Sequence, residues 1–172
     1  TASDDSRYGT YTPSEPDPEP GPEPEPSPYF YYADCKTNFG SMEESIESGS
    51  LDRVWTQTTK YGWKASAYVS GKACAAEATL TTPEIDLTDG KTATLTFSHA
   101  VNFTKTPSED LSVEVECDGE TRVLSVPNWP EGKNWTFVES GDVSLDDFAG
   151  KVIRLIFRYT STSSVASTWE IK

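Results

Sequence analysis

Residues 81–103 read TTPEIDLTDGKTATLTFSHAVNF, and this stretch decides the fold. After the turns marked by Pro83 and Gly90, apolar and polar residues alternate from Thr92 onward. A period of two sends successive side chains to opposite faces, so the pattern is typical of a half-buried antiparallel strand. The closing run over residues 151–172, KVIRLIFRYTSTSSVASTWEIK, has the same character. The chain is therefore expected to consist mainly of β-strands.

Further strand-like runs follow one another between these two, separated by turn residues. The expected strands are Tyr29–Cys35, Val54–Thr58, Tyr61–Val69, Ala76–Thr82, Thr92–Phe103, Leu111–Cys117, Thr121–Val126, Trp135–Val138, Lys151–Tyr159 and Val165–Ile171.

Within these runs, the alternation from Thr92 to Phe103 predicts that Phe97, His99, Val101 and Phe103 face inward. Asp118-Gly119 predicts a tight hairpin, because both residues tolerate positive φ. Two short segments, 41–48 and 144–148, are helix-like, the first with Ser and Glu at capping spacing. Strands that bury one face each predict two stacked antiparallel sheets. The expected fold is an all-β sandwich of the jelly-roll type.

Residues 1–28 differ in composition from the rest of the chain. They hold eight of the twelve prolines, with seven acidic residues against one basic residue. Proline fixes φ and removes donors, and like charges repel, so this segment is expected to stay extended and disordered. We interpret it as a stiff acidic spacer, with a plain disordered tail as the alternative. The predicted domains are the spacer over 1–28 and the sandwich over 29–172. Such a spacer suits a protein with a lipid anchor upstream of residue 1.

The charge balance restricts the possible partners. Acidic residues outnumber basic ones 28 to 14, which gives a formal net charge of −14. A surface this negative repels phosphate backbones, so nucleic acid is not an expected partner. No apolar run approaches the roughly 18 residues that a membrane-spanning helix needs, so no membrane span is expected.

The cysteines and the single histidine do not form a recognisable catalytic or zinc motif. Cys35, Cys74 and Cys117 are widely spaced and lack any CxxC pair. Cys117 shares the inward register of its strand, whereas a disulfide between Cys35 and Cys74 stays open. The sequence has no GxSxG nucleophile elbow that could supply a serine to His99. We therefore expect His99 to be a structural histidine and not a member of a catalytic triad.

Acidic residues at turns leave two further hypotheses open. A structural calcium is possible, since loop carboxylates and carbonyls supply the oxygens that calcium prefers. Its candidate ligands are Asp86, Asp89, Asp118, Asp142, Asp146 and Asp147. A carboxylate pair could also hydrolyse glycosides, but no such pair stands out among 28 acidic residues.

Aromatic residues give the strongest indication of ligand binding. Trp129 lies in the Pro- and Gly-rich loop PNWPEGKNW, where an exposed indole could stack on a sugar ring. Neighbouring Asn128, Lys133 and Asn134 could add hydrogen bonds. The alternative is that Trp129 caps the edge of the sandwich.

Five other aromatic residues complete this interpretation. Tyr61 and Trp63, around a glycine, form a second candidate platform. Trp135 is interpreted as an inward strand residue. Trp55 and Trp169 lie in strand register and are expected in the core.

Several motifs together resemble a known family. TLTTPEIDLT followed by ATLTFSHAVNF, the segment YGWKASAY and the closing STWEIK resemble the choice-of-anchor J domains. These are cleaved-adhesin-like jelly rolls of Bacteroidetes surface proteins. The resemblance covers residues 39–172. Ala78 stands where the family carries tryptophan, and Lys172 stands where relatives have an aspartate that helps to hold calcium. That position, at the end of the chain, suggests a fragment of a longer protein.

The resemblance implies a location outside the cell or on the bacterial outer surface. Combined with the aromatic residues, it favours a non-catalytic module for adhesion or carbohydrate binding, whose partner is a glycan or a surface protein. The alternatives are a purely structural accessory domain of a larger surface protein, or a glycoside hydrolase.

Overall fold

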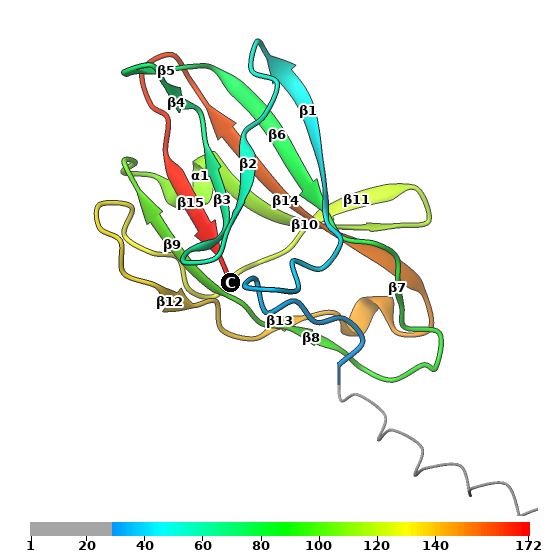
Figure 1. Ribbon diagram of the computed structural model, residues 1–172. Coiled ribbons are helices and arrows are strands. Elements are labelled where there is room, and N and C mark those ends of the chain that lie inside the picture. The colour runs from blue at the N-terminus through cyan, green and yellow to red at the C-terminus, as the bar shows by residue number, and fades with distance from the viewer. Residues whose placement is uncertain (1–28) are drawn as a thin grey trace, which may run out of the picture.

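The computed structural model describes residues 29–172, in which two antiparallel sheets enclose an apolar core (Figure 1). The chain crosses repeatedly from one sheet to the other, as in a jelly roll. The prediction of an all-β sandwich is confirmed. The spacer expected over residues 1–28 lies outside the described residues.

The first sheet has the strand order β1-β6-β14-β10-β11, with β7 paired to β14. Its strands are β1 (Glu43–Gly49), β6 (Ala76–Thr81), β7 (Ile85–Asp86), β10 (Leu111–Cys117), β11 (Glu120–Val123) and β14 (Val152–Ser161). The long central β14 buries Ile153, Leu155, Phe157 and Tyr159, as the alternating pattern predicts. Asp118 and Gly119, both at positive φ, form the expected hairpin between β10 and β11.

The second sheet has the order β12-β9-β15-β3-β2. Its strands are β2 (Trp55–Thr58), β3 (Gly62–Ser66), β9 (Ser98–Asn102), β12 (Val138–Glu139) and β15 (Thr168–Ile171). One row of its inner face pairs Trp55 with Ala65, Ala65 with Trp169, and Trp169 with Val101. All four are buried, so Trp55 and Trp169 are core residues as predicted.

Short elements complete the fold at the two ends of the sandwich (Figure 1). They are the ladder of β4 (Tyr68–Val69) with β5 (Lys72–Ala73), the ladder of β8 (Thr94–Leu95) with β13 (Val143–Ser144), the helix α1 (Pro107–Asp110) and a 3₁₀ turn (Asp146–Phe148).

Four secondary-structure predictions were wrong in whole or in part. The helix expected over 41–48 is instead the edge strand β1, because pairing with β6 satisfies its backbone. The segment 29–35 contains no strand, and only residues 138–139 of the expected strand near Trp135 pair with β9. The helix expected over 144–148 is reduced to the 3₁₀ turn.

The expected strand Thr92–Phe103 is divided into β8 and β9, and its last residue turns outward. Phe103 has φ of +66°, which ends the extended conformation of β9. Its side chain is 62% exposed, so the inward prediction for Phe103 was wrong, whereas Phe97, His99 and Val101 are buried as expected.

Candidate functional site

His99 lies at the centre of an aromatic cluster and is fully buried. Its Nδ1 accepts a hydrogen bond from Trp169 Nε1 at 3.3 Å, and its Nε2 lies 2.8 Å from the carbonyl oxygen of Asn128. These contacts fit a neutral ring that carries its proton on Nε2. Burial lowers the pKa of His99 to about 4, although the bond to Asn128 opposes the shift. The predicted inward position of His99 is confirmed, and its contacts fit the interpretation as a structural histidine.

Trp129 is half-buried and packs against the same cluster. Its ring centroid lies 5.1 Å from that of His99 and 5.8 Å from that of Trp169. The geometry therefore matches the alternative in which Trp129 caps the edge of the sandwich. Asn128 and Lys133 are exposed nearby, and Lys133 pairs with Glu131 at 3.2 Å in solvent.

The second predicted platform, Tyr61 and Trp63, is not brought together with this loop. It lies on the β2–β3 side of the second sheet, whereas the loop leads into β12 at the opposite edge. Trp63 is buried, and its Nε1 donates to the carbonyl oxygen of Phe39 at 2.9 Å. Tyr61 is exposed, with the Lys60 ammonium 5.2 Å from its ring centroid.

Trp135 is the exposed tryptophan, contrary to the sequence interpretation. Its side chain is 49% exposed and meets Phe103 edge to face, with centroids 5.7 Å apart. Together with Tyr68, which is 60% exposed, these rings surround an aromatic groove of about 660 Å³. The residues that line the groove are Lys64, Ser66, Tyr68, Ala73, Phe103, Trp135, Ser164, Val165, Ala166 and Thr168.

The loops that carry Phe103 and Trp135 are fastened to each other. Thr104 donates its backbone N–H to the carbonyl oxygen of Gly132 at 3.0 Å. Gly132 has φ of +83°, and a Cβ there would lie 2.3 Å from the Thr104 carbonyl oxygen, so only glycine permits this approach. Asn134 Oδ1 accepts the N–H of Thr136 at 2.9 Å and fixes the turn around Trp135.

The opposite wall of the aromatic groove is also held in place. Tyr68 begins the β4–β5 hairpin, and its hydroxyl donates to the carbonyl oxygen of Gly71 at 2.9 Å. The turn with Ser164 and Val165 is closed by Thr162 Oγ1, which accepts both of their backbone N–H groups. The groove is therefore a formed surface feature, with aromatic walls that need little reorganisation to receive a ligand.

The floor of the aromatic groove is the outer face of the second sheet. Ser66 pairs with Thr168 across β3 and β15, and Lys64 pairs with Glu170 one repeat further along. Hydroxyl groups and one ammonium group thus lie between the aromatic rings, which is the mixed apolar and polar lining of a ligand site.

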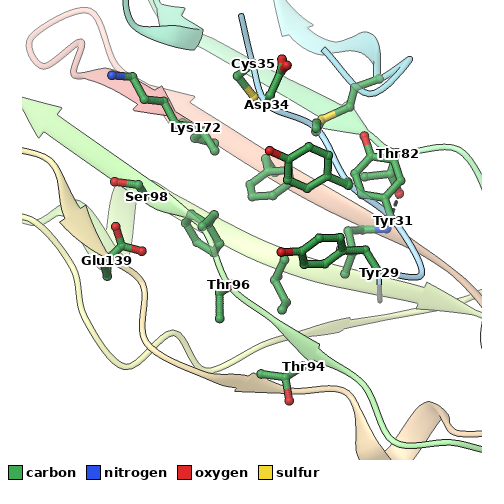
Figure 2. Close-up of a pocket in the computed structure, with 18 residues that line it drawn as sticks. Tyr29, Tyr31, Asp34, Cys35, Thr82, Thr94, Thr96, Ser98, Glu139 and Lys172 are labelled. Carbon is green, nitrogen blue, oxygen red and sulfur yellow. Dashed lines mark hydrogen bonds between the residues drawn. The ribbon is translucent and has the colours of Figure 1, made fainter. Parts of the chain in front are cut away.

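A second hollow lies at the other end of the sandwich, under residues 29–42. This cavity of about 390 Å³ is lined by Tyr31 and Lys172 (Figure 2), together with Phe97 and Phe157. The Tyr31 hydroxyl donates to the Gly40 carbonyl oxygen at 2.7 Å, and burial raises the pKa of Tyr31 to about 12. Tyr29, Tyr31 and Tyr32 of the N-terminal segment line this cavity with their aromatic rings.

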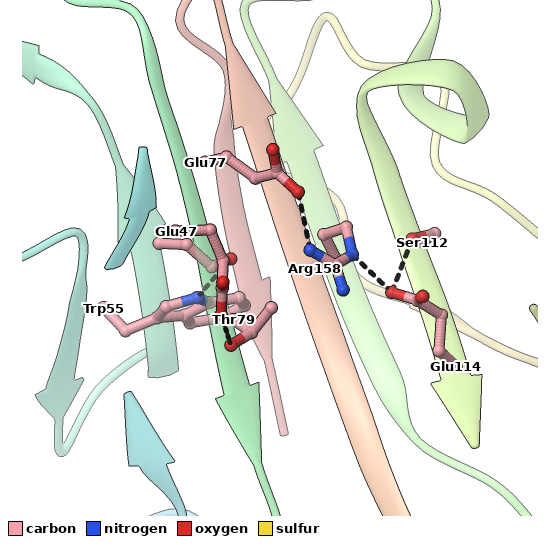
Figure 3. Close-up of polar contacts among 8 residues, drawn as sticks. Glu47, Trp55, Glu77, Thr79, Ser112, Glu114 and Arg158 are labelled. Carbon is pink, nitrogen blue, oxygen red and sulfur yellow. Dashed lines mark hydrogen bonds and ion pairs between the residues drawn. The ribbon is translucent and has the colours of Figure 1, made fainter. Parts of the chain in front are cut away.

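Two carboxylates of the first sheet, Glu77 and Glu114, form ion pairs. On its outer face Arg158 donates from Nε to Glu114 and from a terminal nitrogen to Glu77, each at 2.6 Å (Figure 3). One guanidinium therefore holds both carboxylates, which leaves neither as an isolated acid or base for glycoside hydrolysis.

Metal and disulfide chemistry receive no support within residues 29–172. No group of three or more His, Cys, Asp or Glu side chains gathers there in a way that could hold a metal ion. Cys35, Cys74 and Cys117 are free. Cys35 packs near Trp63 and Lys172 at one end of β3, whereas the backbone N–H of Cys74 donates to the Ala67 carbonyl oxygen beyond the other end. The pairing of Cys35 with Cys74, which the sequence left open, is therefore not present in the structure. Across residues 29–172, every helix is too short and too polar to cross a membrane.

Comparison with known proteins finds similarity to a solved structure but no match in sequence. No protein-family model matches the chain, and no curated protein matches it. The K1 cleaved adhesin domain of Lys-gingipain from Porphyromonas gingivalis W83 is similar in structure, with a TM-score of 0.39 and 16% sequence identity. The match covers 77% of this chain and 98% of that domain. Function does not follow from such a likeness, and has to be argued from the site.

Proposed function

We propose that this domain is a non-catalytic module of the cell surface that serves adhesion by binding carbohydrate in the aromatic groove. The observation that carries the proposal is the half-exposed Trp135 ring, held against Phe103 above a floor of hydroxyl groups. A sugar ring has an apolar C–H face and a rim of hydroxyls, so it matches an aromatic wall beside polar donors and acceptors.

The proposal includes the loop that the sequence identified. Lys133 and Asn134 immediately precede Trp135 and are exposed, so they are placed to add polar contacts at the rim. Asn128 and Trp129 do not contact the ligand in this proposal. They support the loop through the packing of Trp129 on His99. Tyr61 and Trp63 are not among the residues that line this groove and have no part in the proposal.

The wider setting is also a proposal. An acidic, proline-rich segment over residues 1–28 would hold the domain away from the surface to which a lipid anchor attaches it. An extracellular location brings the aromatic groove into reach of glycans on other cells or in the surrounding matrix.

The test compares Trp135→Ala with Tyr61→Ala in affinity electrophoresis through gels that contain different polysaccharides. Both changes remove an exposed aromatic ring, but only Trp135 lines the aromatic groove. Wild type and Tyr61→Ala should be retarded by the same polysaccharide. Trp135→Ala should bind at least about tenfold more weakly, because central aromatic contacts at interfaces contribute more than about 1.4 kcal/mol.

Two outcomes would overturn the proposal. Absence of retardation on every polysaccharide would favour the structural accessory domain. Release of chromophore from aryl glycosides by the wild-type domain, but not by carboxylate variants, would favour the glycoside hydrolase.

A further inference from the structure

Glu170 is a buried carboxyl group on the outer face of the second sheet, beside the aromatic groove. Its neighbours in sequence, Trp169 and Ile171, point into the core, so Glu170 points the other way, like Thr168 on the groove floor. Only 2% of Glu170 is exposed. Within residues 29–172 its Oε2 has no hydrogen-bond partner, which is an unfavourable state for a buried carboxylate oxygen.

Lys64 is the charged residue that faces Glu170. The two are paired in register across β3 and β15, and Lys64 also lines the aromatic groove. Nevertheless they do not form a salt bridge within 4.0 Å in the described part of the chain. Burial raises the pKa of Glu170, although the Lys64 and Lys172 charges pull it down. A carboxyl group and an ammonium group thus lie next to each other with hydrogen-bonding capacity unused.

We propose that Glu170 and Lys64 are the polar anchor of the aromatic groove and that they select a neutral sugar with two adjacent hydroxyl groups. One hydroxyl donates to the Glu170 carboxylate and its neighbour accepts from the Lys64 ammonium. The inference rests on the carbohydrate-binding function proposed above. The flexible stem of Lys64 can rotate to admit the sugar, while Glu170 stays fixed in the sheet.

The charges of Glu170 and Lys64 favour a neutral ligand over a charged one. A uronic acid would bring a second negative charge against a buried carboxylate, and like charges at close range repel. An amino sugar would place a second cation beside Lys64. A hydroxyl pair satisfies both groups without changing the charge balance, and charge-assisted hydrogen bonds are the stronger ones.

The experiment measures binding of wild type, Glu170→Gln, Lys64→Met and the control Lys60→Met. Lys60 is an exposed lysine near Tyr61 and lies outside the groove lining. The probes are neutral glucans, galactans and mannans, with polygalacturonate as the acidic probe and chitosan as the basic one. Glu170→Gln and Lys64→Met should each weaken binding of the neutral polysaccharide about tenfold or more, and Lys60→Met should leave it unchanged.

The outcomes separate this inference from the proposed function. If Trp135→Ala loses binding but Glu170→Gln and Lys64→Met bind like wild type, the polar anchor is refuted and the aromatic groove stands. Preferred binding of polygalacturonate or chitosan would refute selection of a neutral sugar. Failure of the wild type to bind any probe would overturn both. Unfolding temperatures of all variants, measured in parallel, show whether a lost affinity reflects a lost fold.

Discussion

Acidification from pH 7 to pH 4 is expected to destabilise the folded domain by about 3 kcal/mol through His99. Burial holds the pKa of His99 at about 4, below its ordinary value of 6.5. Between these values the unfolded chain binds a proton that the folded chain does not bind. The contribution of neutral His99 is thus complete above pH 6.5 and is lost as the pH falls towards 4, at about 1.4 kcal/mol per pH unit.

The hydrogen bonds of the ring explain why a proton is costly. A proton on Nδ1 would face the Trp169 indole N–H, which already points at that nitrogen from 3.3 Å. Two N–H donors would then face each other inside the aromatic cluster. Among residues 29–172, the contacts of His99 include no carboxylate that could stabilise the positive charge. The charged ring would also have to leave water.

The assay is urea unfolding, followed by tryptophan fluorescence, at half-unit steps from pH 7 to pH 4. His99→Gln is the reference, because glutamine retains a donor and an acceptor but does not titrate. All other titrating groups cancel in the difference between the two proteins, provided that they do not contact position 99. The advantage of the wild type should shrink by about 3 kcal/mol over this range. A difference that stays constant would refute the reasoning.

Three further predictions follow from single contacts. Gly132→Ala should lower the free energy of unfolding by at least about 2 kcal/mol, since its Cβ would meet the Thr104 carbonyl oxygen, whereas Gly71→Ala, at a similar φ in open space, should cost less in the same urea titration. Glu44→Gln should cost about 1–2 kcal/mol in thermal unfolding, because Glu44 Oε2 accepts two backbone N–H groups at the start of β2 and so ties the two sheets together. Glu170→Gln should gain stability relative to the wild type as the pH rises above 4.5, because the folded state holds the proton of the buried carboxyl more tightly than the unfolded state does; a relative loss would contradict this.

The regular part of the fold was predictable because burial follows a period of two. β10 alternates apolar and polar residues without interruption, β14 does so except at Val152 and Ile156, and both lie where the pattern predicts. The edge strand β1 was missed because its sequence, EESIESG, is polar at most positions and carries no clear period. Its conformation is decided by pairing with β6, more than 25 residues further along the chain, and local sequence does not record such a contact.

The candidate site was predicted in kind but not in position. Trp129 and Trp135 both lie among proline, glycine and asparagine residues, so local composition does not distinguish them. Trp129 is drawn inward by His99 and Trp169, which lie on two different strands. The one local signal for Trp135 is the Asn134–Thr136 pair, whose side-chain to backbone bond makes a turn that leaves the central residue outside.

Several residues that line the aromatic groove, and Glu170 beside it, are unfavourable for the stability of the fold. Phe103 adopts a left-handed backbone, which costs about 1–2 kcal/mol in a residue with a large side chain. Glu170 is buried without a partner for Oε2 among the described residues, and Trp135 leaves half of its surface in water. Three such features in one place are expected at a functional site, where selection accepts a loss of stability. The Glu170→Gln variant distinguishes a role in binding from a role in stability. It should raise stability at neutral pH and weaken glycan binding. If Glu170 were purely structural, the same change would lower stability and leave binding unchanged.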